Sequence, residues 1–239
     1  MSFLELRNVS KSYGGGATEV HAIENIDLSV DEGHLVAVMG PSGSGKSTLL
    51  TIAGSLEDPT DGEVLIGGAS LSKMSRNDKA RLRRRTIGYV FQDFNLLAGL
   101  TAAENVALPL ELDGIPARKA RAAGMAVLEE LGLADRATHY PDELSGGERQ
   151  RVSIARAVVG ERHLLLADEP SGALDSTTAE AVMQLILNAC KRGVAAVVVT
   201  HDAHLASWAD RVMFLRDGRA VDQTVLESPE SLLESSPLR

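Results

Sequence analysis

The sequence predicts an α/β fold with a parallel sheet at its centre, an antiparallel β layer beside it and an inserted helical subdomain. Three observations lead to this prediction. Apolar runs at 36–39, 164–167 and 194–199 are each followed at once by glycine or polar residues, as expected for buried parallel strands. The run 4–9 alternates between apolar and polar residues, which indicates a half-buried strand. The stretch 100–160 has apolar positions at helical spacing.

The N-terminal segments predict the antiparallel layer. Leu4–Val9 and Val20–Val30 are candidate strands, and Asp31–Gly33 forms a turn after the second. Glu63–Ile66 is a third short run, bounded on both sides by glycine-containing turns. We therefore expect these segments to pair beside the parallel core.

A glycine-rich loop lies between the apolar run Val36–Met39 and a helix marked by Leu49, Leu50 and Ile52. The loop consists of Gly40, Pro41, Ser42, Gly43, Ser44, Gly45, Lys46, Ser47 and Thr48. Its glycines allow backbone N–H groups to surround phosphates, and the helix adds its positive end. Lys46 is placed to reach the β- and γ-phosphates, and the Ser47 hydroxyl to bind Mg²⁺. The alternative, a chance match in a Gly/Ser turn, is disfavoured by the strand–loop–helix context.

Polar side chains end three further apolar runs. Asp168 and Glu169 follow 164–167, and ligands bind at this end of parallel strands in open α/β sheets. Asp168 suits an Mg²⁺ shell, and Glu169 suits polarising an attacking water. His201 follows the run 194–199, and Gln92 follows Tyr89–Phe91. Taken singly, each has a structural alternative: an acidic turn, a structural histidine or an ordinary strand end.

The helical stretch contains a second glycine loop. One helix is predicted over Ala117–Leu131, ending at Gly132, and another over Glu148–Val159. Ser145, Gly146 and Gly147 precede the second helix, so Ser145 and Gly147 are expected to offer backbone N–H groups to an anion. One loop is enough to hold one triphosphate. The second loop therefore suggests a nucleotide held by another copy of the chain.

The C-terminal part predicts a hairpin, because 212–216 and 219–221 flank Asp217 and Gly218. The tail after Glu227 is rich in Ser, Glu and Pro and is expected to be peripheral. Cys190 is the only cysteine, so there is no disulfide framework, and its apolar helical context predicts a core position.

Length and charge limit the possible functions. A chain of 239 residues suits one domain over 1–239, with a helical subdomain over about 93–160. The net charge of −9 disfavours nucleic acid as the main partner. The basic run Lys79–Arg85 is interpreted as a solvated helix face, with anionic lipid or partner contact as the alternative. No signal peptide or membrane span is recognised, so a membrane domain is expected on another polypeptide.

These motifs resemble the nucleotide-binding subunit of an ATP-binding cassette (ABC) transporter over almost the whole length. Gly40–Thr48 matches the Walker A loop, Gln92 the Q-loop, and Leu144–Gln150 the signature motif. Leu164–Glu169 matches Walker B, Ser171–Asp175 the D-loop, and His201 the switch histidine. The resemblance implies a P-loop NTPase (RecA-like) core. It also implies that Tyr13 stacks on adenine, although Gly14–Gly16 departs from the pattern and Tyr13 could instead be sheet core.

The resemblance also implies roles and partners. The catalytic set would be Glu169, His201, Gln92 and Lys46, and the Mg²⁺ set Ser47, Gln92 and Asp168. The cofactors would be ATP and Mg²⁺, shared within a homodimer at the cytoplasmic face of the membrane. Residues 91–97, 101, 104–106 and 140–141 resemble the macrolide-exporter and lipoprotein-releasing group. This group implies a separate membrane permease, with 93–100 as its docking surface or, alternatively, as core of the helical subdomain.

Three other functions fit the motifs less well. A soluble ABC ATPase without a membrane partner would need a coiled-coil insertion or two sets of motifs. A small-molecule kinase would not need the Ser145 loop or His201. A nucleotide-gated scaffold without catalysis is disfavoured because Glu169 is present.

Overall fold

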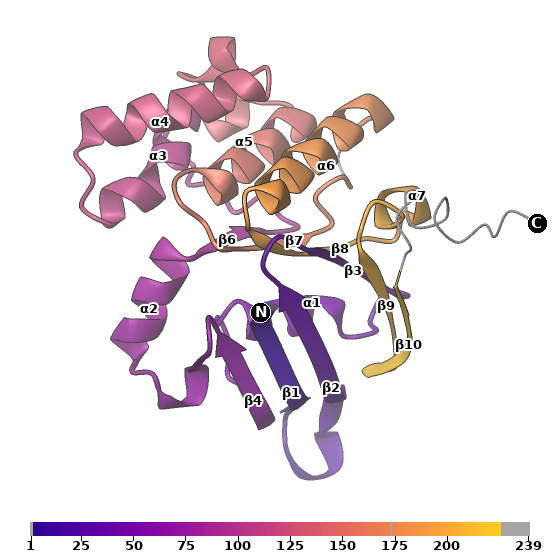
Figure 1. The fold of residues 1–239 in the computed structure, drawn as a ribbon. Helices are drawn as coiled ribbons and strands as arrows, with labels where there is room; N and C mark the ends of the chain where they lie inside the picture. Colours follow the sequence, from indigo (N-terminus) through magenta and orange to yellow (C-terminus); the bar gives the residue numbers. More distant parts are fainter. Residues whose placement is uncertain (1, 173, 226–239) are drawn as a thin grey trace, which may run out of the picture.

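The computed structural model describes residues 2–172 and 174–225, and it consists of layers (Figure 1). An antiparallel sheet lies on one side and a mostly parallel sheet at the centre, with a helix between them. Further helices cover the opposite face of the central sheet. The α/β fold with an antiparallel layer, predicted from the apolar runs, is confirmed. Ala173, within the predicted D-loop, and the C-terminal tail lie outside the described residues.

The antiparallel sheet has the strand order β2-β1-β4-β5. Its strands are β1 (Ser2–Tyr13), β2 (Val20–Asp31), β4 (Asp61–Ile66) and β5 (Ala69–Ser70). A short 3₁₀ turn, η1 (Gly16–Thr18), joins β1 to β2. The inward residues of β1 are Leu4, Leu6 and Val9, and all three are buried. Leu4 and Leu6 alternate as predicted, whereas Val9 turns inward because the strand register shifts between Leu6 and Val9.

The central sheet has the strand order β10-β9-β3-β8-β7-β6, and all neighbouring pairs except β9 and β10 are parallel. Its strands are β3 (Leu35–Met39), β6 (Ile87–Val90), β7 (Leu164–Asp168), β8 (Ala195–Val199), β9 (Arg211–Arg216) and β10 (Arg219–Val225). Strands β7 and β8 are buried throughout, because both faces of the sheet are covered. The predicted hairpin is present, with Asp217 and Gly218 at positive φ in its turn.

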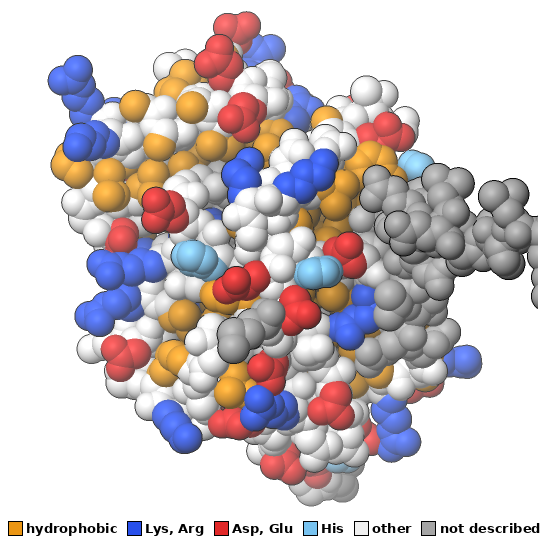
Figure 2. All heavy atoms as spheres, viewed as in Figure 1, with side chains coloured by type: hydrophobic (Ala, Val, Ile, Leu, Met, Phe, Trp, Pro, Cys, Tyr) orange, Lys and Arg blue, Asp and Glu red, His pale blue; other side chains and the backbone are white. Residues whose placement is uncertain are grey.

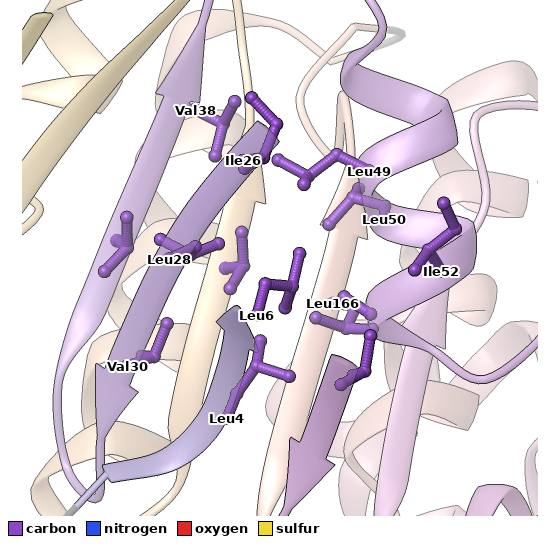
Figure 3. Packing of buried hydrophobic residues seen from close by; sticks show 14 of the residues in the cluster. Leu4, Leu6, Ile26, Leu28, Val30, Val38, Leu49, Leu50, Ile52 and Leu166 are labelled. Carbon is purple, nitrogen blue, oxygen red and sulfur yellow. The ribbon is translucent and has the colours of Figure 1, made fainter. Parts of the chain in front are cut away.

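Helix α1 (Lys46–Ala53) lies between the two sheets and joins their cores. Figure 3 shows Leu49 and Leu50 of α1 near Leu6 and Ile26 of the antiparallel sheet, with Leu166 of the central sheet close by. This packing fixes the helix that follows the glycine-rich loop, and thereby the loop itself.

Helices α5 (Gly146–Val158) and α6 (Ser176–Lys191) cover the other face of the central sheet (Figure 1). Together with α3 (Ala102–Leu112) and α4 (Ala117–Glu130), α5 also encloses a separate helical core. Gly88 of β6 is required here, since a Cβ atom would lie 2.0 Å from the Ala157 carbonyl oxygen. Cys190 is buried at the end of α6, as predicted.

The remaining elements are short or peripheral. They are α2 (Arg76–Arg85), α7 (Ala203–Ala206) and the 3₁₀ turns η2 (Leu71–Lys73), η3 (Ala134–Arg136) and η4 (Pro141–Glu143). Helix α2 carries the basic run and buries no residue, and Figure 2 shows Lys and Arg side chains grouped over it. Among the described residues, none of the helices is both long and apolar enough to cross a membrane.

Candidate functional site

The glycine-rich loop and the ends of three central strands meet around one cavity of about 450 Å³. The predicted residues that line it are Gly40, Ser42, Gly43, Gly45, Lys46, Ser47, Thr48, Gln92, Asp168, Glu169 and His201. The parallel sheet explains this convergence, since the strands before Gln92, Asp168 and His201 end at the same edge. Of the predicted loop residues, Pro41 and the buried Ser44 do not line the cavity.

Close backbone approach explains the glycines of the loop. Gly45 caps α1 at φ 99°, and a Cβ atom there would lie 2.3 Å from the Ala22 carbonyl oxygen of β2. The same atom on Gly40 would lie 2.0 Å from the Leu215 carbonyl oxygen of β9. Lys46 Nζ donates to the carbonyl oxygens of Gly40 and Pro41, at 2.7 and 2.8 Å. The ammonium is therefore held at the mouth of the loop.

Asp168 is buried at the end of β7. Burial raises the pKa of its carboxyl group, and the neighbouring Glu169 carboxylate adds to this effect. A hydrogen bond from Ser47 and the charge of Lys46 act in the opposite direction. A cation beside Asp168 would therefore stabilise the ionised form of its buried carboxyl group.

The donors at this point fit Mg²⁺. Ser47 offers a hydroxyl, Asp168 a carboxylate and Gln92 an amide oxygen, and hard divalent cations prefer oxygen ligands. The cavity brings these three side chains together with Lys46, which is the arrangement predicted for a magnesium–triphosphate complex.

Glu169 has an unusual backbone conformation, with φ 48°. Residues other than glycine seldom adopt positive φ, and such strain collects at functional sites. The Glu169 N–H donates to the Val199 carbonyl oxygen at 3.0 Å, so β8 holds the residue in place. Its carboxylate Oε2 lies 2.9 Å from His201 Nδ1. The predicted base and the predicted histidine thus form a direct pair.

Tyr13 does not line the cavity, and it is not sheet core either, because it is 40% exposed. Its hydroxyl donates to Glu57 at 2.8 Å, and the ring lies beside Lys11. The alternative of a core tyrosine is therefore wrong. Val20, His21 and Ala22 of β2 line the cavity instead, and sequence reasoning missed them because nothing in an alternating strand marks these residues.

The Ser145 loop does not contribute to the residues that line this cavity. Ser145 caps α5 and forms a capping box with Glu148: Ser145 N donates to Glu148 Oε2 at 2.8 Å, and Glu148 N donates to Ser145 Oγ at 3.2 Å. The expectation that Ser145 offers a free backbone N–H is therefore wrong, since this group already has a carboxylate partner. Gly146 and Gly147 supply the first N–H groups of α5.

The segment after Gln92 is held by the helical subdomain. Phe94 and Asn95 both have positive φ, and Arg156 of α5 donates to their carbonyl oxygens at 2.8 and 2.5 Å. Leu97, which follows, is 48% exposed. The alternative that this stretch forms core of the helical subdomain is therefore wrong for Leu97, but it is confirmed for Leu96, which packs against that core.

Known proteins resemble this chain over nearly all of its length. The family pattern described as ABC transporter matches residues 23–172. The pyoverdine export ATP-binding/permease protein PvdT of Pseudomonas fluorescens is 43% identical over 235 residues, and the alignment covers 98% of this chain. An uncharacterized ABC transporter ATP-binding protein, MJ1508 of Methanocaldococcus jannaschii, is 45% identical, and the alignment covers 92% of this chain and 98% of that protein.

A solved structure shows the same fold. The dimeric ATP-binding cassette MJ0796, in a post-hydrolysis state bound to ADP and Pi, superposes with a TM-score of 0.90 at 41% identity. The match covers 94% of this chain and 99% of that one. By contrast, the chain spans only 36% of the length of the pyoverdine export protein.

Proposed function

Because this chain belongs to the ABC transporter family, we propose that it is the ATP-hydrolysing subunit of a transporter and acts on a separate membrane permease. Its place would be the cytoplasmic face of the membrane. The cavity that joins the phosphate-binding loop to the Asp168–Glu169 pair and His201 is the observation that carries this proposal. A site that only stored nucleotide would not need a carboxylate such as that of Glu169 in the same cavity as the phosphate-binding loop.

The proposed reaction is attack of water on the γ-phosphate of ATP. Lys46 would bind the β- and γ-phosphate oxygens, and Ser47, Gln92 and Asp168 would hold Mg²⁺, which supplies neutralisation of charge on the phosphates when bound. Glu169 accepts a proton from the water as its oxygen attacks phosphorus. His201 orients the Glu169 carboxylate through the 2.9 Å contact. The bond between the γ-phosphorus and the bridging oxygen of ADP breaks. Glu169 passes its proton on to the phosphate product or to solvent, and ADP and phosphate leave.

Two copies would complete each site. The Ser145 loop of one copy lies outside the cavity formed by its own chain, which supports a role on the nucleotide of the partner. The amide groups at the start of α5 and the positive end of that helix suit the γ-phosphate. The MJ0796 cassette, which has the same fold, is dimeric, and this supports the pairing of two copies.

Export or mechanical transduction is the proposed use of the cycle. The pyoverdine export protein is named as a joined ATP-binding and permease protein, and this chain corresponds to about a third of it. Leu97 is 48% exposed, which is a large exposed fraction for a leucine side chain. A separate groove beside β6, of about 390 Å³, is lined by Leu108, Pro109 and Leu112 together with four arginines, and it contains no residue of 93–100. Apolar side chains in such places are typical of contact surfaces. We propose 93–100 as part of the docking surface for the permease.

Reconstitution tests this function. The ATPase rate of the purified chain would be measured in vesicles alone and with a candidate permease, chosen from the reading frames adjacent to its gene. Stimulation by that protein is expected. An unchanged rate together with normal basal turnover would favour the alternative, a soluble ABC ATPase without a membrane partner.

A further inference from the structure

The anion-binding loop at the start of α5 carries a negative charge of its own. Glu148 Oε2 accepts the backbone N–H of Ser145 at 2.8 Å, so a carboxylate lies beside the groups proposed to meet the partner's γ-phosphate. The Ser145 backbone N–H, the Ser145 hydroxyl and Arg136 together lower the pKa of Glu148 to about 2. The carboxylate is therefore ionised at every pH at which the protein would be assayed.

Among the residues that the structure describes, the guanidinium paired with this carboxylate is that of Arg136. Arg136, in the turn η3, donates from Nε to Glu148 Oε1 at 2.9 Å, so the two carboxylate oxygens have separate partners. The nearby Arg149 does not share this task. Its guanidinium donates to the Leu144 and Pro141 carbonyl oxygens and lies over the Phe94 ring.

We propose that Arg136 is a positioning residue for the reaction of the partner subunit, because it neutralises Glu148 and so makes the Ser145 loop able to receive a phosphate. This inference rests on the proposed two-copy site. Arg136 acts through Glu148 and need not touch the nucleotide. Its effect should therefore follow the net charge of the pair, which is zero when both residues are present.

The chain contains a matched pair that serves as a control. Thr101 and Glu104 form the same kind of capping box at the start of α3, and Arg121 donates to Glu104 Oε1 at 2.8 Å. Arg121 is 55% exposed and Arg136 is 46% exposed. Arg121→Ala therefore removes a similar exposed contact from a capping box that lies outside the proposed nucleotide sites.

The experiment compares ATP-driven dimerisation in a Glu169→Gln background by analytical ultracentrifugation. Arg136→Ala leaves a net charge of −1 and should raise the dimer dissociation constant on the order of tenfold, since two loops are affected in each dimer. Glu148→Gln leaves +1 and should tighten the dimer, because the amide oxygen can still accept from Ser145. The double variant, Arg136→Ala with Glu148→Gln, restores a net charge of zero, and its dimer dissociation constant should return close to that of the parent. Arg121→Ala should have the same dimer dissociation constant as the parent. Added salt should reduce the differences in dissociation constant among the variants, because it screens their charges.

Each outcome bears on a defined claim. If Arg136→Ala dimerised like the parent, or if Glu148→Gln failed to rescue it, charge neutralisation by Arg136 would be wrong. Melting temperature and monomer ATP affinity are measured alongside, and both should stay within error of the parent in every variant. If the Glu169→Gln parent itself stayed monomeric with ATP, the proposed two-copy site would be wrong. The role of Arg136 would then be wrong as well, because it depends on that site.

Discussion

His201 Nδ1 lies 2.9 Å from Glu169 Oε2, although the two residues are 32 positions apart in the chain. Adjacent parallel strands bring them together: Asp168 at the end of β7 pairs with Val199 at the end of β8. Each side chain extends from the first turn after its strand, so the contact depends on the sheet register and not on a local motif. A shift of one residue in either strand would separate them.

Replacing Glu169 with Gln should retain ATP binding and remove most hydrolysis. The amide is nearly the same size but accepts protons poorly, so the rate should fall by roughly 10²-fold or more. Phosphate release and the ATP-dependent dimer fraction are the two measurements. Turnover close to that of the wild type would show that Glu169 is not the base.

Replacing Lys46 with Ala should abolish ATP binding, because the loop places no other cation at the β- and γ-phosphates. Calorimetric titration with ATP measures the affinity. Lys73→Ala, which removes an exposed lysine of the turn η2, is the control and should bind normally. Equal ATP affinities for Lys46→Ala and Lys73→Ala would show that the nucleotide does not bind at the Lys46 loop.

Replacing Ser145 with Arg should block the dimer and spare ATP binding to the monomer. The longer side chain would fill the space between α5 and the partner's γ-phosphate, while the cavity in its own chain does not include Ser145. ATP affinity at low protein concentration and dimerisation in the Glu169→Gln background are measured separately. A joint loss of both properties would place Ser145 in the site of its own chain.

Replacing Leu97 with Asp should remove stimulation by the permease and leave the basal rate and melting temperature intact. Leu97 is 48% exposed, so a carboxylate there remains hydrated. Val221→Asp, at a 60% exposed position on β10, is the matched control. Full stimulation of the Leu97 variant would contradict docking at 93–100. A fall of several degrees in its melting temperature would contradict the exposure.

Cys190 should resist alkylation in the folded protein. Burial raises the pKa of its thiol to about 12, from an ordinary value near 9.0. Because the folded pKa is higher, the buried thiol contributes full stability below about pH 9 and loses it as pH rises toward 12. Labelling at pH 8 with and without denaturant measures this protection. Rapid labelling without denaturant would show that α6 opens readily.

The elements that sequence reasoning predicted best are those buried on both sides. Strands β7 and β8 read as unbroken apolar runs because helices cover one face and α1 with the antiparallel sheet covers the other. Their shared edge then brought Asp168, Glu169 and His201 to one cavity, as predicted.

The features that sequence reasoning missed depend on two kinds of contact. One joins residues far apart in the chain, and the other is a side chain that competes for a backbone donor. His21 faces the cavity only because β2 passes close to the loop at Gly45. The Ser145 N–H is taken by a carboxylate that competes for the same donor. This second case had a visible signal, since Ser145 and Glu148 have the spacing of a capping box. The pairing of Arg136 with Glu148 had no such signal, because it joins a separate turn to the helix.

The buried Asn105 has a consequence for how tightly a partner can bind. Its side chain accepts from Leu97 N at 2.8 Å and donates to the carbonyl oxygens of Leu97, Leu100 and Thr101. The backbone around Leu97 is thereby fixed on α3 before any contact is made. A flexible loop would lose conformational entropy on association, at about 1–2 kcal/mol for each residue ordered. If 93–100 docks the permease as proposed, a loop already shaped in this way avoids most of that loss, so less of the contact energy is spent on ordering the loop.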